Sequence, residues 1–136
     1  MKSERNPYLF EVPRIGDSSI GYISVSENSD LPFQVKRIYW TYFTPQDVIR
    51  GNHAHKKLQQ VLVAVTGQIK VNTINYRGEQ QSFTLDQPNL SLFVPSMCWR
   101  TLQFSHNAVL MCLASEPFSE DDYIRDYEQF LSHINR

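Results

Sequence analysis

Short runs of β-forming residues, separated at close intervals by turn residues, constrain the fold of this chain most strongly. Val, Ile, Phe, Tyr and Thr dominate the runs, and Gly, Pro, Asn and Asp stand between them. This pattern is typical of an all-β sandwich or barrel of antiparallel strands. We predict strands at residues 20–25, 35–44, 51–55, 59–65, 68–75, 79–85, 91–94, 99–104 and 109–114.

Two turn signals and an apolar N-terminal run refine this prediction. Thr66-Gly67 splits two predicted strands and favours a hairpin, as do residues 76–79, in which Gly78 supplies a positive φ. Residues 8–12 are apolar and precede the first predicted barrel strand. Such a segment is free to pair with the sheet edge of a second copy, so we expect a homodimer that buries it.

The last part of the chain changes to a helical pattern. Ser119 can cap a helix whose first turn carries the acids Glu120, Asp121 and Asp122, near the positive end of the helix dipole. Apolar side chains then recur at helical spacing, at Tyr123, Ile124, Tyr127, Phe130, Leu131 and Ile134. We therefore predict a short amphipathic C-terminal helix that packs on the barrel or on a partner subunit.

Composition and charge exclude several classes of function. The 136 residues fit one domain, which we assign to residues 1–136. A formal net charge of -1 provides no field for nucleic acid, and no stretch reaches the ~20 apolar residues of a membrane span. Without a signal-peptide pattern, we expect a cytoplasmic protein with no nucleic-acid or membrane partner. Cys98 and Cys112 lie in apolar runs, which indicates reduced core thiols.

Two histidines give the strongest indication of chemistry. On a strand, the imidazoles of His53 and His55 point to one face and the side chain of Ala54 points to the other. Two imidazoles side by side on an inward face make either a pair of metal ligands or an acid–base pair. A polar strand face without chemistry is the alternative.

The segment from His53 to Gly67 runs His-x-His, then an amide, then a closing glycine, and it resembles the first motif of the cupin superfamily. Gln60 stands where that motif has a glutamate, and Arg100 stands where the second motif, here beginning at Pro95, has a histidine. Metal cupins use those four side chains as ligands. Arginine cannot lose its proton to ligate, and its charge repels a divalent ion. We therefore predict a cupin, RmlC-like jelly-roll barrel without a metal.

Five strings of the sequence together carry a closer resemblance. They are Lys36-Arg37-Ile38-Tyr39, residues 50–58, residues 94–100, Leu113-Ala114-Ser115 and residues 122–127. They are similar to the nucleotide-sugar 3,4-ketoisomerases within the cupins. The resemblance implies an isomerase, without a cofactor, that moves the keto group of dTDP-4-keto-6-deoxyglucose from carbon 4 to carbon 3 through an enediol. It also implies a role in 3-amino sugar synthesis for surface polysaccharide such as O-antigen, and dimers that exchange N-terminal strands.

The resemblance and the inward face of the strand suggest roles for four side chains. By its match to the family's first histidine, His53 is the candidate base that removes the proton from carbon 3. His55, one inward position further on, would relay a proton between the two oxygens. Tyr39, on the neighbouring strand, either shares that proton or is an ordinary core tyrosine. Arg100 either orients the pocket and stabilises an enediolate by its charge, or is a salt-bridged replacement for the lost ligand.

The nucleotide part of the substrate needs cations and an apolar slot. Arg37 and Arg50 are the candidates for the diphosphate, because guanidinium groups bind phosphate in a bidentate manner. Trp99 is the candidate for contact with the thymine, with Phe93 and Tyr42 as further choices. Core packing is the alternative role for each of these aromatic side chains.

Other functions stay open on the sequence alone. A non-catalytic sugar-nucleotide-binding cupin would have the same pocket without turnover. A sugar-nucleotide 3,5-epimerase would need a base and an acid on opposite sides of the sugar ring, whereas the sequence offers a neighbouring His pair. A metal-dependent dioxygenase is disfavoured by Gln60 and Arg100. Residues 16–22 lack the Asp-x-Arg-Gly of many relatives, so the configuration of the product at carbon 4 is not determined.

Overall fold

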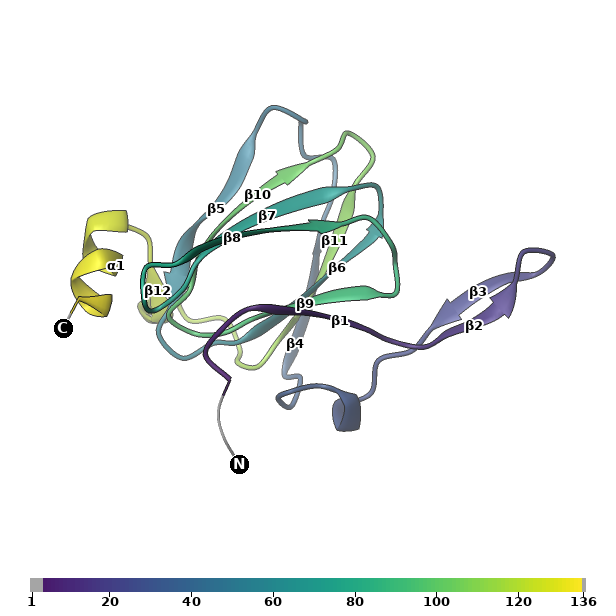
Figure 1. Ribbon diagram of the computed structural model, residues 1–136, viewed down its shortest axis with the longest axis horizontal. Coiled ribbons are helices and arrows are strands. Elements are labelled where there is room, and N and C mark those ends of the chain that lie inside the picture. Colours follow the sequence, from purple (N-terminus) through teal and green to yellow (C-terminus); the bar gives the residue numbers. More distant parts are fainter. Residues whose placement is uncertain (1–3, 136) are drawn as a thin grey trace.

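Two five-stranded antiparallel sheets form the body of the molecule (Figure 1), in a computed structural model that describes residues 4–135. The strand order is β1-β9-β6-β11-β4 in the first sheet and β12-β5-β10-β7-β8 in the second. The first sheet contains β1 (Tyr8–Glu11), β9 (Leu90–Val94), β6 (Gln60–Thr66), β11 (Val109–Ala114) and β4 (Arg37–Thr41). The second contains β12 (Tyr123–Ile124), β5 (Ile49–His55), β10 (Trp99–Phe104), β7 (Ile69–Ile74) and β8 (Gln80–Leu85).

The core lies between the two sheets because inward residues of the strands are apolar. In β7, Ile69 and Val71 are buried while Lys70 and Asn72 are exposed. Inward side chains of both sheets form one cluster, which includes Leu62, Ala64, Ile69, Val71, Leu85, Leu92, Val94, Leu102, Phe104, Leu110 and Cys112. Burial of this apolar surface is the main stabilising contribution to such a fold. The arrangement confirms the predicted all-β antiparallel barrel.

The strands predicted between residues 51 and 114 are present with small shifts of their ends, but one connection differs. The hairpin predicted at Thr66-Gly67 is wrong, because β6 belongs to the first sheet and β7 to the second, and the chain crosses between them. Gly67 permits the crossing, since it has a φ of +77° and a Cβ there would lie 2.5 Å from the Cα of Ala108. The predicted turn at residues 76–79 does join the paired strands β7 and β8.

The C-terminal helix begins later than its apolar spacing predicts. Helix α1 spans Tyr127–Ile134 and is capped by the side chain of Asp126, which accepts a hydrogen bond from the backbone of the first turn. Ser119 precedes only a 3-10 turn at Glu120–Asp122 and forms no side-chain cap. The next two residues are the strand β12, so their burial comes from a sheet edge and not from a helix. Within residues 4–135, no helix is long and apolar enough to cross a membrane.

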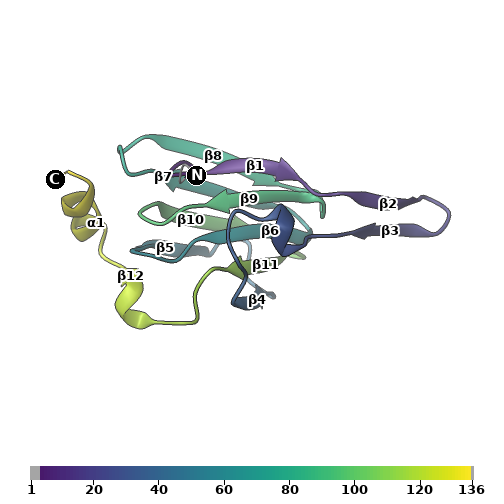
Figure 2. The same cartoon turned by 90° about the horizontal axis from the view of Figure 1, so that it is seen from below.

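A two-stranded arm projects from the barrel at the end opposite α1 (Figure 1 and Figure 2). It consists of β2 (Arg14–Asp17) and β3 (Gly21–Ser24), which in the described part of the chain pair only with each other. Strand β1, by contrast, pairs along its whole length with β9 of the same chain. The expectation that residues 8–12 lack a partner within their own chain is therefore corrected, and the arm is the segment that extends away from the barrel.

An apolar cluster holds α1 against the outer face of the second sheet. It contains Ala54 of β5, Trp99 of β10, Ile124 of β12 and Phe130 of α1. Phe130 is 0% exposed and is the buried residue of the helix. The cluster therefore fixes both α1 and β12 to the sheet.

We predict that Phe130→Ala lowers the free energy of unfolding by about 3–5 kcal/mol, because it leaves a cavity where a buried ring stood. Urea unfolding followed by circular dichroism measures this change. Phe118→Ala is the matched control, since Phe118 is 60% exposed, and it should change the stability by no more than about 0.5 kcal/mol. Equal effects of the two substitutions would contradict the attachment of α1 through Phe130.

Candidate active site

A bulge in β5 places the side chains of two predicted site residues, Arg50 and His53, inside the barrel. Arg100 of β10 faces His53, but the following residue of β10 faces Gly51, so Asn52 is the extra residue. Gly51 and Asn52 form the bulge with φ values of +88° and +56°. Because the bulge shifts the alternation of the strand by one residue, Arg50 lines the interior together with His53.

Glycine is required at position 51 by space as well as by backbone conformation. A Cβ there would lie 2.9 Å from the carbonyl oxygen of Arg100 and 3.0 Å from a methyl group of Leu102. Its positive φ is also one that other side chains rarely adopt. Gly51 therefore permits the backbone conformation of the bulge, and that bulge directs the side chain of Arg50 into the barrel.

The barrel interior holds a cavity of about 80 Å³ beside this bulge. Its lining residues are Tyr39, Thr41, Arg50, Gly51, His53, Gln60, Leu62, Arg100, Leu102, Phe104 and Leu110. The structure thus brings together Tyr39, Arg50, His53 and Arg100 from the residues that the sequence predicts. Gln60, which occupies the position of the cupin glutamate, lies in the same cavity.

Arg100 is the charged centre of the cavity and is only 1% exposed. Its guanidinium donates to Oε1 of Gln60 and, through Nε and Nη2, to the carbonyl oxygen of Cys98 at 3.2 and 3.1 Å. The amide of Gln60 donates in turn to the hydroxyl of Tyr39 at 2.8 Å. Among the residues described, no carboxylate forms an ion pair with Arg100. The cation is therefore buried without a countercharge.

The two positions that differ from metal cupins are bonded to each other. The side-chain oxygen of Gln60 accepts a hydrogen bond from the guanidinium of Arg100, which stands at the histidine position of the second cupin motif in the sequence. Arginine has no lone pair to offer, and its charge opposes that of a metal ion. Nowhere in residues 4–135 do three His, Cys, Asp or Glu side chains converge so that they could hold a metal ion. The cavity instead presents hydrogen-bond donors that suit an anion.

The imidazole of His53 is held by the backbone of the bulge. Its Nδ1 lies 3.0 Å from the carbonyl oxygen of Gly51. Because a carbonyl oxygen can only accept, we assign the proton to Nδ1, which leaves a free lone pair on Nε2. Burial, and then the charge of Arg100, lower the pKa of His53 to about 3. His53 is therefore neutral at pH 7 and has a nitrogen that can accept a proton.

His55 lies beside His53, with ring centroids 4.8 Å apart, and is completely buried. Burial, and then the charge of Arg100, lower the pKa of His55 to about 2. The ring of Tyr123 in β12 covers both imidazoles, at centroid distances of 5.0 Å from His53 and 4.4 Å from His55. Sequence reasoning missed the contact of Tyr123 with the site because it placed the residue on a helix. The resemblance of residues 122–127 to the family was the sequence feature that could have indicated this contact.

Arg37 carries a half-buried guanidinium at the start of β4. Its Nε and Nη2 have no hydrogen-bond partner among the described residues. Its Cζ lies 5.2 Å from the ring centroid of Tyr39 and 5.7 Å from that of Phe118. Buried donors without partners are costly, so this guanidinium is suited to an anionic ligand. Since β4 leads into β5, Arg37 lies toward the end of the barrel that holds His55, whereas Arg50 lies toward the other end.

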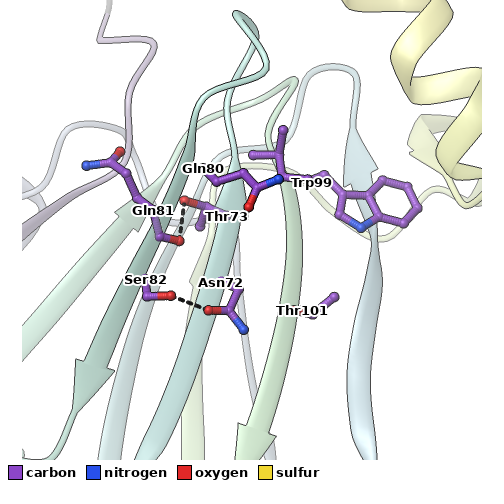
Figure 3. Close-up of a pocket in the computed structure, with 8 residues that line it drawn as sticks. Asn72, Thr73, Gln80, Gln81, Ser82, Trp99 and Thr101 are labelled. Carbon is purple, nitrogen blue, oxygen red and sulfur yellow. Dashed lines mark hydrogen bonds between the residues drawn. The ribbon is translucent and has the colours of Figure 1, made fainter.

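Trp99 points away from the cavity, to the outer face of the second sheet. It packs against Tyr127 and Phe130 of α1, at ring-centroid distances of 5.3 and 5.7 Å. There it borders a polar groove of about 410 Å³ that is also lined by Asn72, Thr73, Ile74, Gln80, Gln81, Ser82 and Thr101 (Figure 3). None of these lining side chains is an acid or a base. The structure therefore does not bring Trp99 together with the other predicted site residues.

Known proteins are similar to this chain over nearly its whole length. Residues 5–135 match the family model FdtA, which is described as WxcM-like, C-terminal. A curated relative from Aneurinibacillus thermoaerophilus is TDP-4-oxo-6-deoxy-alpha-D-glucose-3,4-oxoisomerase. It is 39% identical over 122 residues, which make up 89% of this chain and 87% of the relative.

Two solved structures extend the similarity to the fold. A 3,4-ketoisomerase from Helicobacter canadensis is 36% identical, with a TM-score of 0.90 over 98% of this chain and 100% of that chain. The 3,4-ketoisomerase QdtA from Thermoanaerobacterium thermosaccharolyticum, as a histidine-to-asparagine variant in complex with TDP-4-keto-6-deoxyglucose, is 32% identical. Its TM-score is 0.89, and the match covers 96% of this chain and 94% of that chain. The chain therefore belongs to the FdtA family, the sugar-nucleotide 3,4-ketoisomerases of the cupin superfamily.

Proposed function

We propose that this protein isomerises dTDP-4-keto-6-deoxyglucose to the corresponding 3-keto sugar by proton transfer, with His53 as the base and without a metal. One observation carries the proposal: a neutral imidazole with a free Nε2 shares a cavity with the buried, uncompensated charge of Arg100. Such a base can take a proton from carbon, and the cation stabilises the enediolate that results. The relative solved with TDP-4-keto-6-deoxyglucose supports the choice of this substrate.

The proposed reaction moves two protons and leaves the carbon skeleton intact. Nε2 of His53 takes the proton from carbon 3, the electron pair of that bond forms the double bond to carbon 4, and the C4 oxygen becomes anionic. The hydroxyl proton on the C3 oxygen then passes to the C4 oxygen. His55 is the relay once the cavity widens, since it is buried beside His53 and is not one of the residues that line the cavity. The C3 carbonyl forms as the imidazolium of His53 gives its proton to carbon 4 and returns to its starting state.

Formation of the enediolate raises the pKa of His53 and so favours proton uptake by its imidazole. Burial, and then the charge of Arg100, lower the pKa of His53. A negative charge on the sugar offsets that of Arg100 and raises the pKa of the imidazole toward the range in which it takes up a proton. Burial raises the pKa of Tyr39, so its hydroxyl keeps its proton and can donate a hydrogen bond to the anionic oxygen.

The cavity of about 80 Å³ is smaller than the ~300–1,000 Å³ of typical ligand pockets, so it must widen to admit the sugar. Arg50 lines this cavity with an exposed side chain, which can move without losing buried contacts. We assign the diphosphate to Arg50 or to Arg37, whose buried Nε and Nη2 lack partners among the described residues. The two cations lie toward different ends of the barrel, so their contributions to binding can be separated.

We also propose that two copies form a homodimer through the arm. Ile15 and Ile23 face each other across β2 and β3, and both are exposed, at 56% and 65%. An isolated two-stranded hairpin is at best marginally stable, so a partner surface would stabilise it. The outer face of β4 offers such a surface, since its side chains Ile38 and Trp40 are also exposed.

The wider biological role follows from the substrate that we propose. A 3-keto sugar nucleotide is a suitable precursor for a 3-amino sugar, because an amine can replace the new carbonyl oxygen. A role in 3-amino sugar synthesis for surface polysaccharide stays a prediction, as does a cytoplasmic location.

Incubation with dTDP-4-keto-6-deoxyglucose, followed by NMR of the product, is predicted to show conversion of the 4-keto sugar to the 3-keto sugar. His53→Asn should keep the fold and the affinity for thymidine diphosphate but lose turnover by at least about 10²–10⁴-fold, because asparagine cannot act as a base. His106→Asn is the matched control, since His106 is exposed and lies outside the cavity.

Two results would contradict this assignment. Binding of the sugar nucleotide without any turnover by the unmodified protein would favour a non-catalytic binding protein. Near-normal turnover by His53→Asn, together with loss of turnover by His55→Asn, would make His55 the base.

The lowered pKa of His53 predicts the dependence of activity on pH. A base must be neutral, so kcat/KM should stay constant as the pH falls through about 6.5, the ordinary pKa of histidine, and decline only well below it. The fold itself loses stability below about pH 6.5, because the unfolded chain binds protons at histidines that the folded chain leaves neutral. Rates are therefore measured where circular dichroism shows folded protein. An acid limb centred near pH 6.5 is the contrary result.

Arg37→Ala or Arg50→Ala should weaken the binding of thymidine diphosphate, measured by calorimetric titration. The same variant should raise KM with less effect on kcat, which is the pattern for lost ground-state binding. Arg77→Ala serves as the control, since Arg77 is an exposed arginine at the turn between β7 and β8. Unchanged affinity in both variants would show that neither guanidinium binds the diphosphate.

Sedimentation velocity should give the unmodified protein about twice the chain mass of 15.9 kDa. Ile23→Asp should shift it to the monomer, because the charge would be buried in the proposed interface. Ser24→Asp places the same charge on the opposite face of β3 and should leave the dimer intact. A monomeric unmodified protein, or a dimer that survives Ile23→Asp, would argue against assembly through the arm.

A further inference from the structure

Asp122 approaches His55 where β12 joins the end of β5. Tyr123 of β12 pairs with His55, and the backbone N–H of Lys56 donates to the carbonyl oxygen of Asp122 at 2.9 Å. This pairing brings the side chain of Asp122 alongside the imidazole, although the two residues lie far apart in the sequence. Oδ2 of Asp122 is 3.5 Å from Nδ1 of His55.

The backbone of the turn after β5 holds the carboxylate in this position. The N–H of Lys57 donates to Oδ1 of Asp122 at 2.9 Å, and the N–H of Leu58 donates to Oδ2 at 3.1 Å. The side chains of Asp122 and His55 are 15% and 1% exposed, so little water reaches either. A carboxylate fixed by two backbone donors cannot turn away from the imidazole without losing both bonds.

Among residues 4–135, no other group is bonded to the imidazole of His55 so as to select its tautomer. Both of its ring nitrogens lack a hydrogen-bond partner within the described residues. For the neighbouring His53, the carbonyl oxygen of Gly51 selects the form with the proton on Nδ1. A carboxylate beside Nδ1 selects the same form, because it can accept a hydrogen bond but cannot donate one.

We propose that Asp122 is a positioning residue that keeps the proton of His55 on Nδ1 and leaves Nε2 free to accept a proton. Its consequence for catalysis rests on the proposed function, in which His55 relays the hydroxyl proton of the sugar. In that step the O–H bond at the C3 oxygen breaks as an N–H bond forms at Nε2. The same N–H bond then breaks as an O–H bond forms at the C4 oxygen, and Asp122 exchanges no proton in either transfer.

The carboxylate also offsets the positive charges around His55. Arg100 and Arg37 both disfavour the imidazolium form of His55. The relay passes through that form, so a negative charge next to Nδ1 lowers its cost. The same arrangement of a carboxylate beside Nδ1 orients the histidine in hydrolases that use a Ser-His-Asp triad.

The test combines Asp122→Asn with ¹⁵N NMR of the imidazoles in histidine-labelled protein. In the unmodified protein, His55 should carry its proton on Nδ1 and show an unprotonated Nε2. In Asp122→Asn, the carboxamide no longer requires a donor at Nδ1, so the proton of His55 should move at least partly to Nε2. His53 is an internal control, because its Nδ1 is bonded to Gly51 and should not change. The affinity for thymidine diphosphate should be unaffected, and kcat should fall at least about 10-fold.

A second variant separates positioning from a general loosening of the turn. Oγ of Ser115 accepts a hydrogen bond from the N–H of Gln59 at 2.8 Å, so Ser115→Ala weakens the same turn without touching His55. It should leave both tautomers unchanged. The proposal is overturned if His55 carries its proton on Nε2 in the unmodified protein, which is measured even if Asp122→Asn does not fold. It is also overturned if Asp122→Asn leaves the tautomer unchanged. A changed tautomer with unchanged kcat would support the positioning and contradict the relay role of His55.

Discussion

A buried cation without a countercharge is the constraint on which the rest of the site depends. Removing an ion from water costs several kcal/mol unless its partners compensate. The partners of Arg100 are neutral: the amide oxygen of Gln60 and the carbonyl oxygen of Cys98. Burial, and then this charge, lower the pKa of both His53 and His55. The fold thus maintains a cavity that favours an anion, which suits a reaction that passes through an enediolate.

Two local features of the fold position the site residues around this charge. The bulge at Gly51 and Asn52 directs the side chains of His53 and Arg50 into the same cavity. The carbonyl oxygen of Gly51 then sets the tautomer of His53. Strand β12 then closes the end of β5 and brings an aromatic ring over both imidazoles. Both features lie outside the regular alternation of the barrel. The regular strands supply the core together with Tyr39, Gln60 and Arg100, and the irregular features position the two histidines beside them.

The alternation of a strand was enough to predict the inward pair His53 and His55, and the cupin pattern was enough to identify Gln60 and Arg100. Alternation also indicates that Trp99, next to Arg100 on one strand, faces the other way, and Trp99 does pack on α1 while Arg100 lines the cavity. The direction of Arg50 could not be predicted in this manner, because it depends on the register of β5 against β10. The burial of Ile124 fits a helix and an edge strand equally well, and only tertiary pairing decides between them.

Turnover of dTDP-4-keto-6-deoxyglucose in heavy water by chelator-treated protein, followed by NMR, tests directly whether His53 and the charge of Arg100 carry out the isomerisation with no metal ion. We expect undiminished formation of the 3-keto sugar, with deuterium at carbon 4 where the imidazolium has exchanged its proton with solvent. Loss of turnover on chelation, restored by a divalent metal ion, would contradict a metal-free reaction.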